Sequence, residues 1–152
     1  MIRILVDADA CPVKEEVYRV ARRYGLKTYV VSNGWMQVPR EALIEQVVVD
    51  AGPDVADDWI AERAGAGDVV VTADMPLAGR CVAAGAAVLA PDGREWTPAN
   101  IGAALATRNL MTDLRSAGLE TRGPKPFGAK DRSAFLSALD RVLGRIARGA
   151  QR

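Results

Sequence analysis

The sequence predicts an α/β fold: a three-layer sandwich in which helices cover a central five-stranded, mainly parallel sheet, followed by C-terminal helices. Three observations lead to this prediction. Five short apolar runs, each bounded by Gly, Asp, Asn or Pro, are typical of strands buried on both faces. Helical patterns lie between the runs, which is the alternation of right-handed βαβ units. After the fifth run the pattern becomes purely helical.

The expected strands are short runs rich in Val, Ile and Leu. Because these runs are apolar throughout rather than alternating with polar residues, both faces of the sheet should be covered. The runs lie at residues 2–6, 29–31, 47–49, 69–71 and 87–89.

Helices are expected between the strands, where apolar residues recur at three- and four-residue spacing. This spacing occurs at residues 13–24, 55–60 and 77–84. In the segment 35–44 the signal is different, because Pro39 suits the first position of a helix. A helix is therefore expected to begin at Pro39.

A further helix is expected directly after the last strand. Thr97 and Pro98 have the residue types of an N-cap and a first helical position. From there the helical pattern continues to about Ser116, and Gly118 provides a stop.

The chain is expected to end in one more helix. Residues 123–128 are rich in Gly and Pro and should form a loop, and an amphipathic pattern then runs from Lys130 to about Arg148. No repeat or linker divides the sequence. We therefore expect residues 1–152 to form a single α/β domain, with residues 97–148 forming C-terminal helices packed on it.

Composition limits the chemistry that the protein can perform. The sequence contains no histidine, which excludes Ser–His and Cys–His nucleophile pairs and His-ligated metal sites. Its two cysteines, Cys11 and Cys81, fit no zinc spacing and no disulfide framework, so a reducing compartment is expected. There is no signal-peptide pattern and no apolar stretch of membrane length. These features predict a cytoplasmic protein without a membrane partner.

Charge is distributed unevenly along the chain. Residues 1–93 contain 9 Lys and Arg against 14 Asp and Glu, whereas residues 94–152 contain 11 against 5. An acidic centre beside a basic surface would suit a phosphate-bearing polymer such as RNA or single-stranded nucleic acid. Ordinary solvated C-terminal helices would give the same asymmetry, so both interpretations stay open. The candidate phosphate-binding residues are Arg108, Arg115, Lys125 and Arg132.

Polar residues follow several of the expected strands. In open parallel sheets, ligands bind outside the carboxyl ends of the strands. The first strand is followed by Asp7 and Asp9, the second by Asn33, and the fourth by Thr72 and Asp74. These side chains should therefore meet at one edge of the sheet. The two aspartates after the first strand have no evident packing purpose there.

A second acidic group opens the helix that follows the third strand. Asp54 could cap this helix, and Asp57 and Asp58 could interact favourably with its dipole. The same residues could instead join the acids at the strand ends. Trp35, close to the end of the second strand, could stack a nucleobase, although simple loop packing is the more ordinary interpretation.

Convergence of several carboxylates needs a compensating interaction. Two like charges about 4 Å apart repel by roughly 4 kcal/mol at an effective dielectric constant of about 20. One or two Mg²⁺ or Mn²⁺ ions would offset this repulsion, since hard cations bind carboxylate oxygens and water. The alternative is that one carboxyl group is protonated and has a raised pKa.

Several segments resemble the motifs of the bacterial YaiI/YqxD family. They are VDADACP at residues 6–12, DVAD at 54–57, VTADMPLA at 71–78 and GP at 123–124. The resemblance runs nearly from end to end, and the first and third motifs are highly specific. The family is grouped by similarity with the PIN-like metal-dependent nucleases, which implies a PIN-like, Rossmann-like domain.

The same grouping implies roles for individual residues. Asp7, Asp57 and Asp74 would be metal-binding acids, with Asp9 beside them. Polar support would come from Asn33, Thr72 and Asp58.

Three functions are compatible with these features. The leading hypothesis is a phosphodiesterase for RNA or single-stranded nucleic acid, in which Asp7, Asp9, Asp57 and Asp74 hold Mg²⁺ or Mn²⁺ and the products carry a 5′-phosphate and a 3′-hydroxyl. The second is a haloacid-dehalogenase-like phosphatase, in which Asp7 is phosphorylated and Asp9 is the acid and base. The third is a non-catalytic module that binds nucleic acid or protein through the basic C-terminal helices. The sequence leaves the oligomeric state open, a dimer included.

Overall fold

The computed structural model describes residues 2–118 and 126–150 of the chain. Its strands are β1 (Arg3–Asp7), β2 (Lys27–Ser32), β3 (Ile44–Val48), β4 (Asp68–Val71), β5 (Ala87–Leu89) and β6 (Glu95–Trp96). Its α-helices are α1 (Lys14–Tyr24), α2 (Val55–Arg63), α3 (Met75–Ala83), α4 (Ile101–Ser116) and α5 (Ala129–Ala150), and a 3₁₀ turn, η1 (Ala8–Ala10), follows β1.

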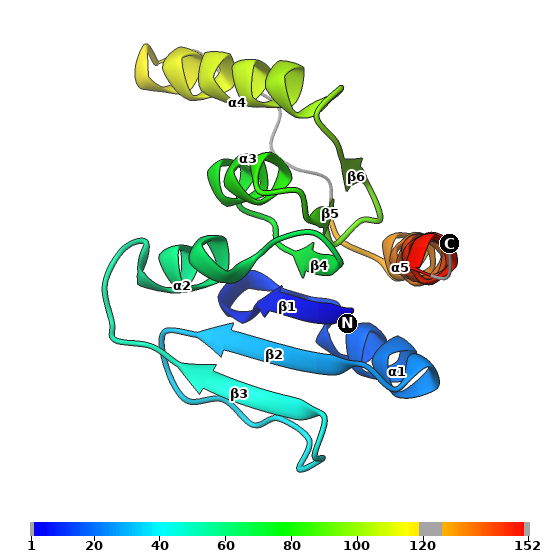
Figure 1. Ribbon diagram of the computed structural model, residues 1–152. Coiled ribbons are helices and arrows are strands. Elements are labelled where there is room, and N and C mark those ends of the chain that lie inside the picture. The colour runs from blue at the N-terminus through cyan, green and yellow to red at the C-terminus, as the bar shows by residue number, and fades with distance from the viewer. Residues whose placement is uncertain (1, 119–125, 151–152) are drawn as a thin grey trace.

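The strands form one sheet in the order β3-β2-β1-β4-β5-β6 (Figure 1). Strands β1 to β5 pair in parallel, and β6 pairs antiparallel with β5. The predicted α/β class and mainly parallel sheet are therefore confirmed. The sequence predicted five strands, and the structure adds the two-residue β6 at one edge.

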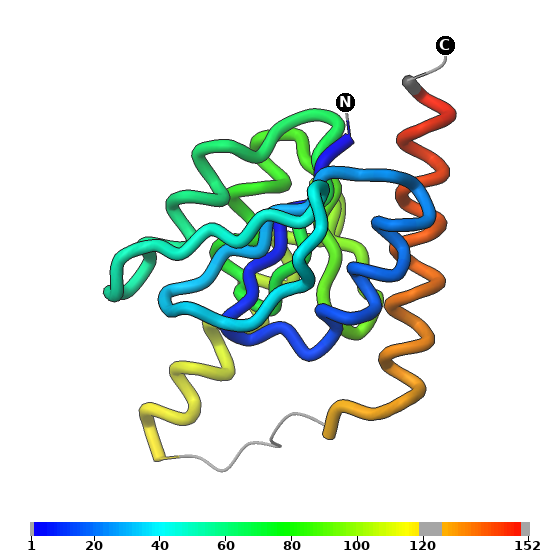
Figure 2. Tube along the Cα trace, turned by 90° about the horizontal axis from the view of Figure 1, so that it is seen from below, coloured from blue at the N-terminus to red at the C-terminus, as the bar shows by residue number. Residues whose placement is uncertain are grey.

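Helices cover both faces of the sheet, which gives the three predicted layers. Alternate residues of β1 point to opposite faces, so Ile4 and Val6 pack with α1 and α5, whereas Leu5 packs with α2 and α3. All three residues are fully buried. Figure 2 shows α5 (orange to red) running alongside α1 (blue), although the two helices lie far apart in the sequence.

The helix α4 lies outside these layers and packs mainly on α3 (Figure 1). None of its residues is buried. Gly79 of α3 allows the contact, because a Cβ atom there would lie 3.2 Å from the Leu105 side chain of α4. As predicted, α4 ends at Ser116 and Gly118 follows with a φ of +82°.

Two expected helix starts are wrong. No helix begins at Pro39; the chain there is irregular, and the Gln46 side chain donates a hydrogen bond of 2.6 Å to the Met36 carbonyl. The strand β3 then starts at Ile44, earlier than expected. The helix α4 begins at Ile101 rather than at Pro98, because residues 97–100 form a turn in which the Thr97 carbonyl accepts from Asn100 and Ile101.

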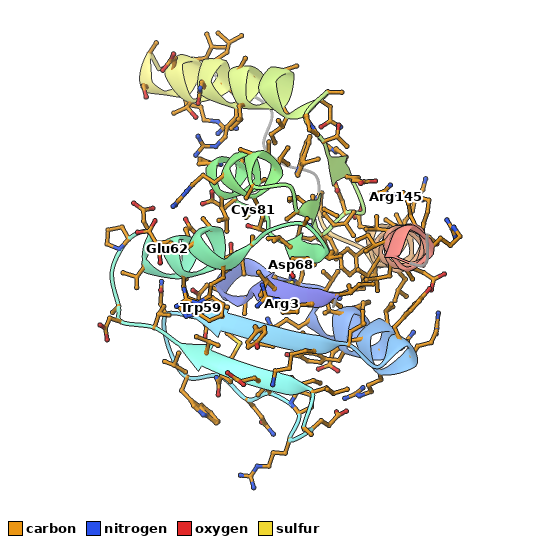
Figure 3. All side chains as sticks on the ribbon, in the orientation of Figure 1. Arg3, Trp59, Glu62, Asp68, Cys81 and Arg145 are labelled. Carbon is orange, nitrogen blue, oxygen red and sulfur yellow. The ribbon has the colours of Figure 1, made fainter. Side chains whose placement is uncertain are left out.

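An ion pair joins the amino ends of the two central strands. Arg3 at the start of β1 and Asp68 at the start of β4 lie side by side (Figure 3), with an Nη2–Oδ2 distance of 2.8 Å and an Nε–Oδ1 distance of 3.0 Å. Asp68 also accepts a hydrogen bond from the backbone of Gly65. Among the described residues, no helix is both long and apolar enough to cross a membrane.

Candidate metal centre

The structure brings acidic residues together in a cavity at the carboxyl ends of β1, β2 and β4. Because the chain places β2 on one side of β1 and β4 on the other, the loops that follow these strands diverge and leave a crevice. The cavity measures about 440 Å³. Among the described residues, its charged lining side chains are all aspartates: Asp7, Asp9, Asp54, Asp57 and Asp74. We call this space the carboxylate cavity.

Asp7 is the last residue of β1 and is held by the neighbouring strand. The Thr72 hydroxyl donates a hydrogen bond of 2.8 Å to Asp7 Oδ2 and accepts one of 2.9 Å from the backbone N–H of Asp74. Burial raises the pKa of Asp7, the Thr72 hydrogen bond lowers it, and the charges of Asp74 and Asp9 raise it further. The carboxyl groups of β1 and of the β4–α3 loop are therefore close enough to influence one another.

Asp74 has both of the roles that the sequence left open. It is the N-cap of α3, where its Oδ1 accepts a hydrogen bond of 2.9 Å from the Leu77 backbone, and Pro76 follows within the first turn. It also lines the carboxylate cavity. Capping therefore fixes the position of this carboxylate at the cavity wall.

Asp57 lies in the first turn of α2 and shows the strongest electrostatic effect in the cavity. Its pKa is raised from 3.8 to about 6, mainly by burial and then by the negative charges of Asp74, Asp7 and Asp54, while Arg80 acts in the opposite direction. A carboxyl group with these neighbours binds a proton, or another cation, more readily than an ordinary aspartate does.

Asp9 connects the ends of β1 and β2. The η1 turn buries Ala8 and leaves Asp9 exposed at the cavity. The backbone N–H of Asn33 donates to both carboxylate oxygens, at 3.2 Å and 3.0 Å. Asn33 was predicted as polar support, and the contact that the structure shows is made by its main chain.

Asp54 is a cavity residue that the sequence interpretation did not include among the site residues. It occupies the N-cap position of α2, but its side chain makes no capping hydrogen bond, and its φ of +70° lies in the left-handed region. The spacing of Asp54 and Asp57 was the available signal, because residues three apart lie on the same side of a helix.

Asp58 lies apart from this group although it is next to Asp57 in the sequence. It forms an ion pair of 2.7 Å with Arg80 of α3, and both side chains are about half exposed. It does not line the carboxylate cavity. The helix thus separates two adjacent aspartates into one that faces the cavity and one that faces a cation.

The predicted phosphate-binding residues are not gathered at the cavity. Arg108 and Arg115 lie on the exposed helix α4, and neither lines the carboxylate cavity. Lys125 lies outside the described residues. Arg132 of α5 donates to the Pro12 carbonyl at 2.5 Å and pairs with Glu16 at 3.1 Å. Trp35, the candidate for base stacking, lines a separate hollow beside residues 37–40.

The donor atoms of the carboxylate cavity suit a hard divalent cation. They are carboxylate oxygens, which Mg²⁺ and Mn²⁺ prefer, and the lining contains no Cys. As the described side chains lie, no three acidic or thiol groups are close enough to hold one ion together. This arrangement fits an ion that is bound by one or two carboxylates and keeps several waters, as Mg²⁺ commonly does.

Comparisons with known proteins identify the family. A sequence profile described as "Uncharacterized BCR, YaiI/YqxD family" matches residues 5–145. A UPF0178 protein of Azorhizobium caulinodans is 65% identical over 147 residues, which cover 97% of this chain and 92% of that protein. A UPF0178 protein of Caulobacter sp. (strain K31) is 60% identical over 148 residues, with 97% and 98% covered. No solved structure matches the chain. The chain therefore belongs to the YaiI/YqxD family, as its motifs predicted.

Proposed function

We propose that the protein is a Mg²⁺- or Mn²⁺-dependent phosphodiesterase that acts on RNA or single-stranded nucleic acid. The observation that carries the proposal is the carboxylate cavity, where aspartates from three segments of the chain meet without a basic residue among the described lining. The pKa of Asp57 is raised mainly by burial, and the negative charges of Asp74, Asp7 and Asp54 raise it further. A divalent cation would offset the repulsion between these carboxylates.

Each aspartate has a distinct part in this proposal. Asp7, at the end of β1 and bonded to the Thr72 hydroxyl, and Asp57 of α2 would be ligands. Asp74, in the cap of α3, and Asp9, held by the Asn33 N–H, would bind a second ion or the waters of the first. When bound, Mg²⁺ or Mn²⁺ lowers the pKa of water and neutralises charge on a phosphodiester. The carboxylates then leave the cavity open on one side for the substrate backbone.

The phosphatase alternative lacks a specific supporting contact. A phosphoryl group on Asp7 would place additional negative charge beside Asp9, Asp57 and Asp74. None of the described residues that line the cavity is Lys or Arg, so no side-chain cation is in place to balance it. The Thr72 hydroxyl is close to Asp7, but it already donates to that carboxylate.

The proposal can be tested with end-labelled RNA and single-stranded DNA oligonucleotides. The purified protein should cleave at least one of them with Mn²⁺ and should be inactive in EDTA. Asp7→Asn and Asp57→Asn should reduce cleavage by at least about 100-fold, because a metal ligand is lost. The matched control is Asp58→Asn, which changes the neighbouring aspartate outside the cavity and should retain activity. Cleavage that persists in Asp7→Asn would contradict the proposal.

A further inference from the structure

A second cavity adjoins the carboxylate cavity. It measures about 420 Å³ and is lined mainly by apolar side chains, so we call it the apolar cavity. The two cavities share Ala10 and Ala73, the residues next to Asp9 and Asp74. We propose that the apolar cavity binds a nucleobase of the strand whose phosphate lies at the carboxylate cavity. This inference rests on the proposed function for that phosphate, and it adds a binding site for the base.

Aromatic rings form two parts of the lining. Trp96 of β6 is nearly buried, with 7% of its surface exposed, and forms part of the inner wall. Phe127 is 36% exposed, so its ring is accessible at the rim. Met75 and Pro12 add further apolar surface. A base can stack on such a ring whatever its identity, because every base has a flat π-face.

Arginine side chains accompany both rings. The Arg94 guanidinium lies 5.3 Å from the centre of the Trp96 ring, and the Arg132 guanidinium lies 5.1 Å from the centre of the Phe127 ring. Guanidinium groups beside aromatic rings are a recurrent feature of surfaces that bind single-stranded nucleic acid.

The walls of the apolar cavity are fixed in advance by contacts with α5. Arg132 joins Phe127 to the Pro12 carbonyl and to Glu16 of α1. The lining residues Asp92 and Arg94 flank Gly93, whose turn lies directly against α5; a Cβ atom there would be 2.7 Å from the Ala134 carbonyl oxygen. A site whose walls are already in place loses less conformational entropy when a ligand binds.

The charges of the two cavities differ, and this difference favours a base in one and a phosphate in the other. In the apolar cavity, Asp92 accepts hydrogen bonds from the backbone and the guanidinium of Arg94, so the pair is balanced. In the carboxylate cavity the charged lining is entirely acidic. A neutral nucleoside should therefore bind without metal, whereas a nucleotide should bind better once a divalent cation is present.

Other occupants fit the surroundings less well. A fatty acid or a phospholipid has no flat ring that could stack on Phe127 or Trp96. An apolar peptide side chain would fill the space but would make no use of the carboxylate cavity beyond Ala10 and Ala73. A base joined to a phosphodiester matches both cavities at once.

The experiment is a titration of ¹⁵N-labelled protein with adenosine in EDTA. The protein has three tryptophans, so three indole N–H signals are expected, each assigned with a Trp→Phe variant. Adenosine should shift the Trp96 signal with a dissociation constant in the millimolar range, while Trp35 and Trp59 serve as internal controls. Phe127→Ala should weaken binding at least about fivefold, and Phe127→Tyr should retain it.

Several outcomes would overturn the inference. The first is that the Trp96 indole signal does not shift at saturating adenosine, or that the Trp35 signal shifts in its place. The second is that a folded Phe127→Ala variant binds adenosine with unchanged affinity. A Trp96 shift with an apolar dipeptide but not with adenosine would assign the cavity to a protein partner instead. The cleavage assay and the adenosine titration together distinguish failure of this inference from failure of the proposed function. Metal-dependent cleavage without adenosine binding removes only the base site, whereas adenosine binding without metal-dependent cleavage removes only the phosphodiesterase.

Discussion

Replacement of Asp57 by asparagine should stabilise the metal-free protein at neutral pH. The folded structure raises the pKa of Asp57 from 3.8 to about 6, so the folded chain binds this proton more tightly than the unfolded chain does. Stability therefore falls as the pH rises through this interval, and it stays reduced above pH 6. Asparagine keeps the shape of the side chain and removes the charge.

The magnitude follows from the pKa shift. One pKa unit corresponds to about 1.4 kcal/mol, so complete ionisation of Asp57 would cost at most about 3 kcal/mol. The carboxyl group is partly open to solvent, and screening should reduce the effect to about 1 kcal/mol. We therefore expect Asp57→Asn to raise the melting temperature by about 2–4 °C at pH 8 in EDTA. At pH 3, below the pKa of Asp57 in both the folded and the unfolded chain, the gain should nearly disappear.

The matched control is Asp58→Asn, measured by thermal unfolding at the same two pH values. Both variants remove one carboxylate from the first turn of α2, so they lose the same interaction with the helix dipole. Asp58, however, is paired with Arg80, so its replacement should change stability slightly and in the unfavourable direction. If Asp57→Asn destabilised the protein at pH 8, or if its effect were the same at both pH values, the electrostatic reasoning would be wrong.

Three further predictions concern the cavity and the fold. Mn²⁺ at about 100 times its dissociation constant should stabilise the unaltered protein by about 2.7 kcal/mol in urea unfolding, and Asp7→Asn should lose most of this gain. Gly93→Ala should lower the free energy of unfolding by roughly 2 kcal/mol or more, because the φ of Gly93 is +92° and the new Cβ would meet the backbone of α5. The control is Gly102→Ala on α4, where nothing lies within 4 Å of the new Cβ, and this variant should be neutral or stabilising. Asp54→Asn should raise the melting temperature in EDTA because it removes a negative charge from the cavity. Asp54→Gly should raise it further, because glycine adopts a positive φ without strain. A lower melting temperature in both variants would show that Asp54 makes a stabilising contact.

The sheet was predictable where strands are buried on both faces. The continuous apolar runs of β1, β4 and β5 gave these strands to within a residue or two. The edge strand β3 reads Ile-Glu-Gln-Val-Val, with polar residues at its second and third positions, so a search for uninterrupted apolar runs placed it too late. The strand β6 has two residues and pairs antiparallel, and so short a segment has no periodicity to detect.

The candidate site was predictable in outline and not in detail. Because strands in a parallel sheet end at a common edge, the sequence was sufficient to bring Asp7, Asp9 and Asp74 to one place. Residue type and position alone could not separate Asp57 from Asp58, which only the family resemblance placed in different roles, since the ion pair that holds Asp58 depends on where α3 packs. The contact between Arg132 and Glu16 likewise joins residues 116 positions apart, and only the packing of α5 on α1 reveals it.

The position of α4 outside the three layers determines which part of the molecule unfolds locally first. A helix with no buried residue, which contacts the core through the partly buried Ile101 and Ala104, can separate from its support while exposing little of the interior to water. Amide hydrogens of α4 should therefore exchange with solvent at a much lower free energy than those of β1, whose central residues are fully enclosed. Limited proteolysis should accordingly cut within α4 first and leave the sheet with its acidic crevice intact.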